Sequence, residues 1–410
     1  MTPGRTIMLI DQNAFFASVE QAANPSLRGK PIAVVGSGGR TVVTTASYEA
    51  RAYGVKTGMS VYEAKRYCPE LIIVVGDNKK YTYTSSKINE IYLDYTPLVE
   101  AFSIDESFLD VTGSISLFGS AERIAYLIKA RIKHAFGINC SAGIAPNKLL
   151  SKLAADFKKP DGVSIVRPDD VRRLMDGLPI GELCGIGKKT EKVLHLMSIY
   201  TCGELGRCPV ERLTKRFGII GPRLKLMGQG IDESPVIPIG QEDDVKSVGH
   251  SMTLERDISD FQEIRRYLLQ LSEMVGARAR KHNVAGKTIH LYVRYADFFT
   301  SWGKQTTLTN YTSQSDEIYK TALRILDSIE LEQPVRLLGI SLSNLKHEAE
   351  QIPLFESDRK KMFATQAMDK INDKFGKMSV TYGSLLPGKD NSRGQVIPPS
   401  WRPGGIKNIV

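Results

Sequence analysis

The sequence contains few cysteines, and their spacing does not match a bridge or metal pattern. Five cysteines occur in 410 residues, at Cys68, Cys140, Cys184, Cys202 and Cys208. A small, odd number of cysteines excludes a disulfide-rich secreted scaffold and fits a reducing compartment. A cluster that could suggest zinc has no CxxC pair or comparable spacing, so ordinary packing is favoured for it. This cluster consists of Cys184, His195, Cys202 and Cys208.

Long apolar runs are also missing. No stretch approaches the roughly 20 apolar residues of a membrane-spanning helix. The N-terminal apolar run is short and meets Asp11, and it has no small-residue cleavage site of the kind that ends a signal peptide. We therefore expect a cytoplasmic protein without a membrane segment.

Acidic residues are outnumbered by basic ones. The chain has 55 Lys and Arg against 45 Asp and Glu, a formal net charge of +10, while its 42% hydrophobic content is that of an ordinary soluble protein. A basic excess suits a polyanionic partner such as nucleic acid, although alone it is weak evidence. A chain of 410 residues is too long for one typical core, so we expect several domains.

The pattern of apolar residues changes along the chain. Strand and helix patterns alternate through about residue 166, which indicates an α/β or α+β domain. Short helical pieces follow, then a linker rich in proline and acidic residues. A βαββαβ pattern comes next, with strands at 245–254, 287–295, 304–309 and 335–344 and helices at 259–282 and 313–328. In the polar tail, residues 359–375 have the pattern of an amphipathic helix that Gly376 would end, with no assigned partner.

Three carboxylates stand at the ends of apolar strand patterns. Asp11 ends the strand predicted over 6–11, and Asp105 and Glu106 lie where the strands predicted over 99–105 and 106–112 meet. Clustered carboxylates repel one another, and a divalent cation removes that cost. Mg²⁺ prefers such hard oxygen ligands, and a pair of such ions serves phosphoryl or nucleotidyl transfer. The alternative is that Asp105 and Glu106 form a solvated turn, which is the commoner case for an isolated Asp-Glu pair.

Four segments in one order carry a resemblance to a known family. They are DQNAFFASVE at 11–20, TTASYEARAYGV at 44–55, SIDESFLDV at 103–111 and GIAPNKLLSKLAADFKKPDG at 143–162. Together they resemble the Y-family of translesion DNA polymerases, in the bacterial DNA polymerase IV branch, and the similarity extends from about residue 6 to residue 346. The resemblance implies a monomeric, error-prone DNA-directed DNA polymerase without proofreading.

The resemblance also implies a fold. It is multidomain, α/β and α+β, and shaped as a right-hand polymerase. A ferredoxin-like palm would comprise 1–11 and 77–166, and small fingers 12–76. A helical helix-hairpin-helix thumb at 167–235, a linker at 236–246, a βαββαβ little finger at 247–346 and a tail at 347–410 would follow.

Site residues are implied by the same resemblance. Asp11, Asp105 and Glu106 would be catalytic and, with the Gln12 carbonyl, would hold two Mg²⁺ per active site. Asn13 stands where the family commonly has Asp. Phe16 resembles the steric gate against ribonucleotides. The residues implied to bind the nucleotide are Phe15, Phe16, Thr45, Tyr48, Arg51 and Lys159.

Partners implied by the resemblance are primer–template DNA, a dNTP and the sliding clamp (its beta subunit). The segment GIGKKT resembles a helix-hairpin-helix turn, whose glycines let backbone amides approach a phosphate. The residues implied to contact DNA are Gly185, Gly187, Lys188, Lys189 and Ser247. The segment EQIPLFE resembles a clamp-binding motif, with Gln351, Leu354 and Phe355 as its contacts.

Other interpretations remain open at this stage. VVGSGGR at 34–40 partly matches a dinucleotide-binding fingerprint, but Thr41 replaces the third glycine and no helix start follows. The chain could be a catalytically inactive DNA- and clamp-binding factor on a polymerase scaffold. It could also be another two-metal palm enzyme, such as a nucleotidyl cyclase. The lesions bypassed, the error spectrum and the expression control do not follow from the sequence.

Overall fold

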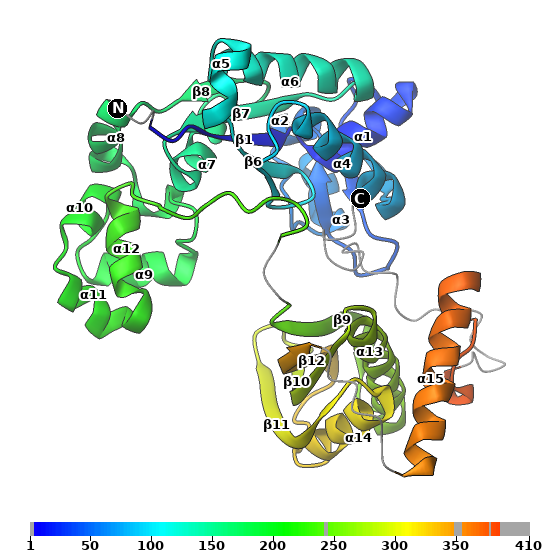
Figure 1. Ribbon diagram of the computed structural model, residues 1–410. Helices are drawn as coiled ribbons and strands as arrows, with labels where there is room; N and C mark the ends of the chain where they lie inside the picture. The colour runs from blue at the N-terminus through cyan, green and yellow to red at the C-terminus, as the bar shows by residue number, and fades with distance from the viewer. Residues whose placement is uncertain (1–3, 242–244, 348–354, 377–378, 386–410) are drawn as a thin grey trace. The chain divides into compact units, whose positions relative to one another are not determined.

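The computed structural model describes residues 4–241, 245–347, 355–376 and 379–385 (Figure 1). The chain forms two compact units: of the described residues, the first contains 4–37 and 41–241, and the second contains 38–40 together with those from 245 to 385. Within the described ranges, every helix is too short or too polar to cross a membrane. Each unit is described below by itself.

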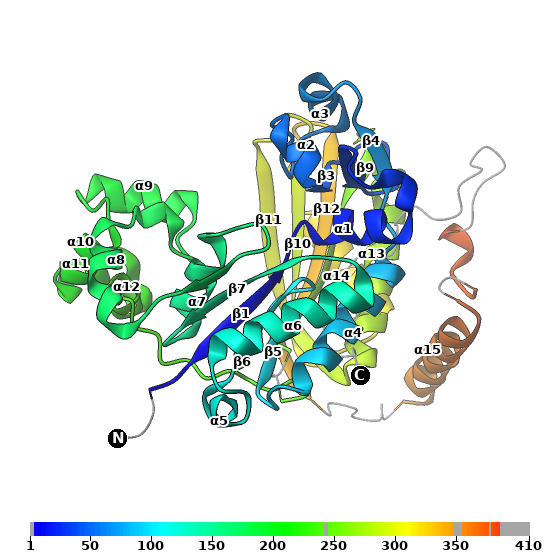
Figure 2. The same ribbon diagram turned by 90° about the horizontal axis from the view of Figure 1, so that it is seen from above.

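A five-stranded sheet is the centre of the first unit. Its strand order is β5-β6-β1-β7-β8, and all neighbours are antiparallel except β7 and β8. Helices α4 and α6 contribute to the core on one face, and α7 packs on β7 and β1 (Figures 1 and 2). The elements are β1 (Ile7–Gln12), α4 (Asn78–Leu93), β5 (Val99–Ala101), β6 (Glu106–Asp110), α5 (Ile115–Phe118), α6 (Ala121–Phe136), β7 (Cys140–Ala145), α7 (Lys148–Asp156) and β8 (Val163–Ile165).

Strand β1 is buried on both of its faces. Successive side chains in a strand point to opposite faces, so Met8 and Ile10 join one core while Ile7 and Leu9 join another. All six residues of the strand are buried. The predicted strand over 6–11 is therefore confirmed, one residue displaced.

The prediction of a strand over 99–105 is wrong for the second half of that range. β5 stops at Ala101, and the next four residues form a tight connection to β6. The amides of Phe102 and Ser103 both donate to the Glu106 carbonyl, each at 3.0 Å, which closes the hairpin. The Ser103 hydroxyl then donates to the Asp105 carboxylate, a local bond that competes with strand pairing.

A smaller sheet, ordered β3-β2-β4, lies in the same unit. Its core contains Ala33, Val43, Ala50 and Ala64, small residues that let short helices pack closely. The elements are α1 (Phe15–Ala23), β2 (Ile32–Val35), β3 (Val43–Ala46), α2 (Tyr48–Ala52), α3 (Val61–Tyr67) and β4 (Ile72–Val75). Residues 34–40 run from strand β2 into a turn without a helix, so the dinucleotide fingerprint is not formed there.

Short helices make up the rest of the first unit's fold. They are α8 (Val171–Gly177), α9 (Lys188–Leu196), α10 (Cys202–Arg207), α11 (Val210–Phe217) and α12 (Gly221–Gly228). Thr201 and Glu204 form a capping box at the start of α10. Cys202 and Cys208 are buried in the apolar core of this region, whereas Cys184 is exposed. Across the described ranges, no cluster of three or more His, Cys, Asp or Glu is arranged to hold a metal.

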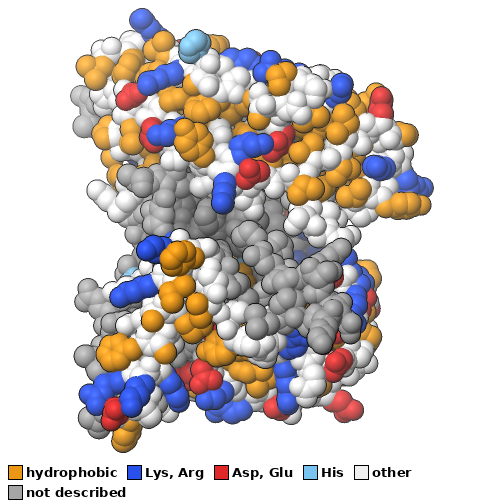
Figure 3. Space-filling view, turned by 90° about the vertical axis from the view of Figure 1, so that its right-hand side faces the viewer, with side chains coloured by type: hydrophobic (Ala, Val, Ile, Leu, Met, Phe, Trp, Pro, Cys, Tyr) orange, Lys and Arg blue, Asp and Glu red, His pale blue; other side chains and the backbone are white. Residues whose placement is uncertain are grey.

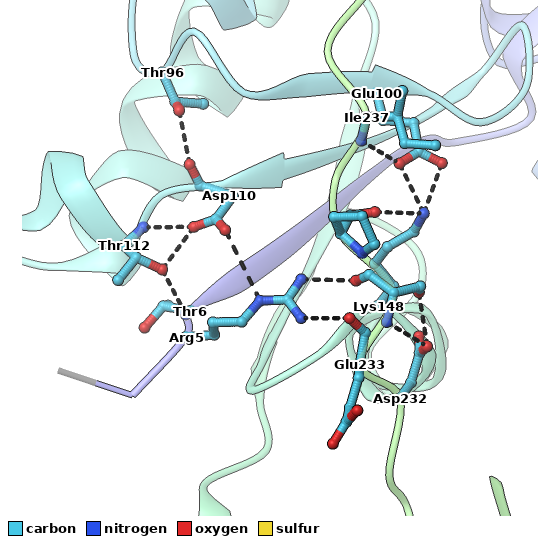
Figure 4. A network of polar contacts seen from close by, with 12 residues as sticks. Arg5, Thr6, Thr96, Glu100, Asp110, Thr112, Lys148, Asp232, Glu233 and Ile237 are labelled. Carbon is cyan, nitrogen blue, oxygen red and sulfur yellow. Dashed lines mark hydrogen bonds and ion pairs between the residues drawn. The ribbon is translucent and has the colours of Figure 1, made fainter. Parts of the chain in front are cut away.

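Residues 230–239, which we call the strap, run back from α12 across the five-stranded sheet (Figure 4). The Ile239 amide donates to the Val99 carbonyl at 2.9 Å, and Val236 is buried in the core beside Phe108. Lys148 and Arg5 donate to strap carbonyls, at Pro235 and at Glu233 and Ser234 respectively. Because strap residues bond along this length, the strap is part of the first unit rather than a free linker.

The second unit is a four-stranded antiparallel sheet with two helices on one face. Its strand order is β11-β10-β12-β9, and α13 and α14 share its apolar core. The βαββαβ prediction is confirmed, with longer strands than expected. The elements are β9 (Ser247–Ile258), α13 (Phe261–Lys281), β10 (Val284–Tyr295), β11 (Ser301–Thr312), α14 (Ser315–Leu326) and β12 (Val335–His347).

The predicted amphipathic helix of the tail is present as α15 (Glu356–Phe375), and Gly376 ends it. Its partner within the second unit is α13. The Arg280 guanidinium donates to both carboxylate oxygens of Asp369, at 2.5 and 2.9 Å. A bidentate pair of this kind fixes direction as well as distance.

Candidate active site

The sheet register brings two of the predicted carboxylates face to face. In the antiparallel pairing of β1 with β6, Asp11 is the direct partner of Glu106. Opposite residues of such a pair have side chains on the same face of the sheet. Asp105 immediately precedes β6, and its carbonyl accepts from the Gln12 amide at 2.9 Å. The three carboxylates therefore belong to one end of the β1–β6 pair, as the sequence predicted.

Two lysines pair with these carboxylates. Lys159 Nζ lies 2.6 Å from Asp11 Oδ2 and 2.7 Å from Asp156 Oδ1. Lys152 Nζ lies 2.6 Å from Glu106 Oε1. Each ammonium group supplies the positive charge that a buried carboxylate needs.

The carboxylates still carry a cost of burial. Burial raises the pKa of Asp11 to about 7; Lys159 lowers this pKa, and Glu106 raises it further. Burial also raises the pKa of Asp105, and the hydrogen bond from Ser103 opposes that rise. A raised carboxyl pKa means that negative charge is unfavourable here without a nearby cation.

The donor set fits a hard divalent cation. The available groups are carboxylates, which Mg²⁺ prefers, and burial raises the pKa of Asp11 and of Asp105 despite the nearby Lys159. The Gln12 side chain points to the opposite face of β1 from Asp11, where its Nε2 donates to the Tyr92 hydroxyl at 2.8 Å. Within the described residues, no group of three or more His, Cys, Asp or Glu is arranged to hold a metal. Lys159 and Lys152 pair with Asp11 and Glu106, and Asp105 accepts from the Ser103 hydroxyl.

Two aromatic residues open helix α1 directly after the strand. Ala14, the N-cap of α1, has a left-handed backbone with φ 46°, a strained conformation for a residue with a Cβ. Phe15 is buried in the core, so only its backbone is available to a ligand. Phe16 is partly buried, and its ring stacks on Tyr81 with centroids 4.3 Å apart. The stack gives Phe16 the fixed orientation that a steric gate requires.

Basic and hydroxyl groups lie on β3 and α2 of the same unit. Arg51 Nε donates to the Ala46 carbonyl at 3.0 Å, and its guanidinium lies 4.9 Å from the centroid of the Tyr48 ring. Burial raises the pKa of Tyr48, while the charges of Arg51 and Lys159 lower it. Thr45 pairs with Val34 in the β2–β3 ladder. Tyr48 therefore lies within electrostatic reach of both cations, as a triphosphate site would need.

Sequence reasoning missed Lys152 as a member of this site. Lys148 and Lys152 are four residues apart on α7 and pair with Glu100 and Glu106, which come from neighbouring strands. Residues at this spacing share a helix face. The spacing in KLLSKL was a usable signal, but the strand carboxylates they meet are more than 40 residues away in sequence.

The residues predicted to bind DNA lie in the two units separately. Gly187 is the N-cap of α9, Gly185 has a left-handed φ of 96°, and the Lys188 side chain is 95% exposed. Lys189 is in the first turn of α9. Ser247 begins β9 and is exposed. Amides and ammonium groups here are open to solvent, which a phosphate contact requires.

The predicted clamp motif is only partly described. Gln351 and Leu354 lie outside the described residues. Phe355 is the N-cap of α15 and is 69% exposed.

On the face shown in Figure 3, Lys and Arg side chains are interspersed with acidic and hydrophobic ones rather than gathered in a single patch.

Known families match most of the chain. Residues 10–156 match the impB/mucB/samB family, residues 245–354 match the C-terminal domain of that family, and residues 168–197 match the HHH motif of the IMS family. These three ranges include the end of β1 from Ile10 onward, all of β6 and α7, the GIGKKT turn and the second unit's sheet.

Relatives and a solved structure agree with these matches. The chain is 43% identical over 387 residues to a protein named DNA polymerase IV from Pelotomaculum thermopropionicum, covering 93% of this chain and 96% of the relative. It is 41% identical to DNA polymerase IV of Moorella thermoacetica over 389 residues, with 93% and 96% covered. It is 40% identical to DNA polymerase IV 1 of Bacillus subtilis over 389 residues, with 93% of each covered.

A solved chimera of Y-family DNA polymerases superimposes with a TM-score of 0.74 at 29% identity, covering 83% of this chain and 99% of the chimera. The expected fold class is thereby confirmed: mixed α/β sheets, a helix-hairpin-helix region and a C-terminal antiparallel sheet with helices. The chain therefore belongs to the Y-family of DNA polymerases, in its bacterial DNA polymerase IV branch.

Proposed function

We propose that the chain is a translesion DNA-directed DNA polymerase, which adds deoxynucleotides to a primer 3′-hydroxyl without proofreading. The observation that carries this proposal is the register that sets Asp11 opposite Glu106, next to Asp105. Paired acidic groups at the end of one strand pair, with Tyr48 and Lys159 nearby, suit transfer of a nucleotidyl group.

Asp11, Asp105, Glu106 and the Gln12 carbonyl would hold two Mg²⁺. When bound, such ions stabilise the attacking and leaving oxygens and favour the ionised 3′-hydroxyl. The protein contributes the carboxylates, already held by a buried strand register. The raised pKa values of Asp11 and Asp105 favour a cation over isolated negative charge.

The chain's own cations would orient the triphosphate. Arg51 offers a planar fork for phosphate oxygens and Lys159 a single mobile ammonium group. In the absence of nucleotide, Lys159 neutralises Asp11 at 2.6 Å. The same ammonium group would contact a triphosphate oxygen when nucleotide is bound, and Asp11 would then serve as a ligand of the metal.

Phe16 would exclude ribonucleotides. Its ring is held against Tyr81, so it cannot turn aside readily when a 2′-hydroxyl approaches. Phe15 would contribute its backbone amide to the triphosphate, since its side chain is in the core. Thr45 and Tyr48 would add hydroxyl donors.

DNA would be held by backbone and phosphate contacts rather than by base readout, because a polymerase must accept any sequence. In the first unit, one DNA phosphate would be contacted by Gly185, Gly187, Lys188 and Lys189. In the second unit, Ser247 would contact another. The tail would bind the sliding clamp through Gln351, Leu354 and Phe355, which raises the local concentration of enzyme at the primer. We propose a cytoplasmic monomer.

Primer extension by the purified protein tests this function. Asp105→Asn should abolish incorporation while DNA affinity stays within about twofold, because the change removes a metal ligand and no DNA contact. Asp94→Asn is a matched control, since this exposed acid pairs only with Arg131 among its ion pairs in the described chain. Extension by Asp105→Asn at the wild-type rate contradicts the assignment. Absence of extension by wild type at any Mg²⁺ or Mn²⁺ concentration favours the inactive-factor alternative.

A further inference from the structure

The turn that carries Lys159 is held by hydrogen bonds more than by packing. Pro160 and Asp161 are both exposed, and Pro160 borders a cavity of about 360 Å³ that Asn13 and Tyr48 also line. Asp161 has a left-handed backbone with φ 62°, which side-chain-bearing residues adopt at a cost. Such a turn keeps one conformation only if its neighbours fix it.

Asn13, which directly follows strand β1, fixes the turn from one side. It is 3% exposed, and its Oδ1 accepts from the Asp161 amide at 2.8 Å. Its Nδ2 donates to the Ser141 hydroxyl at 3.0 Å, and its own amide donates to the Asn139 carbonyl at 2.9 Å. Because both ends of the carboxamide are anchored, the Asp161 backbone is tied to the same sheet that carries Asp11.

Lys129 fixes the turn from the opposite side. Its side chain comes from α6 and is only 11% exposed. Nζ donates to the Asp161 carbonyl at 2.8 Å, to the Asp161 carboxylate at 2.5 Å and to the Cys140 carbonyl at 2.5 Å. An ammonium group has three N–H donors, and all three are used. Two independent side chains therefore meet at Asp161, two residues after Lys159.

We propose that Asn13 and Lys129 are positioning residues that fix the Asp161 turn from both sides and thereby set where the Lys159 ammonium stands. The inference rests on the proposed role of Lys159 in binding the triphosphate. Neither residue touches substrate in this account; each acts through the turn. The proposal also gives Asn13 a function, because its side-chain amide forms hydrogen bonds with both the turn and β7.

Lys129→Met is the first test, with Lys133→Met as its matched control. Lys133 lies one turn further along α6, and among the described residues its Nζ makes only a long hydrogen bond, 3.5 Å from the Gly137 carbonyl. Losing the charged hydrogen bonds of Lys129 should raise KM for the dNTP about tenfold, with kcat nearly unchanged. Lys129→Arg should recover part of the loss. Equal KM values for Lys129→Met and Lys133→Met would overturn the inference.

A double-mutant cycle separates this inference from the proposed function. In a Lys159→Met background, Lys129→Met should raise KM no further, because the group that it positions is absent. If Lys159→Met alone leaves KM unchanged, the proposed role of Lys159 fails. If Lys159→Met raises KM and the effect of Lys129→Met adds to it fully, Lys129 acts elsewhere and the inference is refuted.

Asn13 supplies a second pair of variants should Lys129→Met not fold. Asn13→Asp retains oxygens that can accept from the Asp161 amide and the Ser141 hydroxyl, whereas Asn13→Ala retains neither contact. We expect Asn13→Ala to raise KM for the dNTP and Asn13→Asp to stay much closer to wild type. Equal KM values for these two variants would refute the positioning role.

Discussion

The pKa of Asp11 makes the metal-free protein less stable as the pH rises. The folded carboxyl has a pKa of about 7, against about 3.9 in an unfolded chain. Between these values the folded state keeps a proton that the unfolded state has lost, so the free energy of unfolding decreases with increasing pH. At 1.36 kcal/mol for each pKa unit, the decrease between pH 5 and pH 8 is about 3 kcal/mol.

Asp11→Asn should remove this dependence while abolishing catalysis. The amide does not titrate, and Lys159 keeps its ion pair with Asp156 at 2.7 Å. Relative to wild type in EDTA, the variant should therefore gain about 3 kcal/mol between pH 5 and pH 8, or roughly 5–10 °C in Tm for a unit of this size. Asp105 shares the direction of the wild-type slope, so the comparison of variant with wild type isolates Asp11.

Thermal unfolding in EDTA and in Mg²⁺, at several pH values, is the measurement. Mg²⁺ should stabilise wild type more at pH 8 than at pH 5, because it binds the ionised carboxylate, and should stabilise Asp11→Asn much less at either pH. Asp94→Asn is the control for a general effect of removing an acid. Parallel stability curves for Asp11→Asn and wild type across this range would refute the reasoning.

Three further outcomes are expected. Phe16→Ala should admit ribonucleotides because it removes the ring stacked on Tyr81; an unchanged ratio of kcat/KM for ribonucleotides and deoxynucleotides would contradict this. Gly143→Ala should lower the Tm sharply, since a Cβ there would lie 2.1 Å from a backbone oxygen of α7; such a clash costs about 3 kcal/mol or more, and a wild-type melting curve would disprove it. Arg280→Gln should increase hydrogen exchange in α15 by weakening its bond to Asp369, and unaltered exchange would show that other contacts hold the helix.

The sequence predicted the part of the site that depends on local pattern. Asp11 and Glu106 each stand at one end of a short run of apolar residues, and such a run indicates a buried strand. The helix at 359–375 followed from its period and its terminal glycine in the same way. Such features need only neighbours in the chain, which is why they could be anticipated.

Features that depend on distant partners were not anticipated. Lys152 pairs with Glu106 across 46 residues of sequence, and Asn13 reaches Asp161 across 148. The strap is rich in proline and acidic residues, a composition typical of linkers, yet it bonds along the first unit because Arg5 and Lys148 supply donors for its carbonyls. The pattern of apolar and polar residues within one segment carries no information about such contacts.

The double burial of β1 ties the chemistry to the hydrophobic core. A slip of one residue in this strand would exchange its two faces, and Ile10 would then stand where Asp11 now meets Glu106. In the observed register Ile7 and Leu9 pack in one core and Met8 in the other, so a slip would put each side chain into a space packed for a different one. Aliphatic residues that never contact a nucleotide thus set the position of Asp11. Substitutions that change their size or branching should reduce DNA synthesis before they unfold the enzyme.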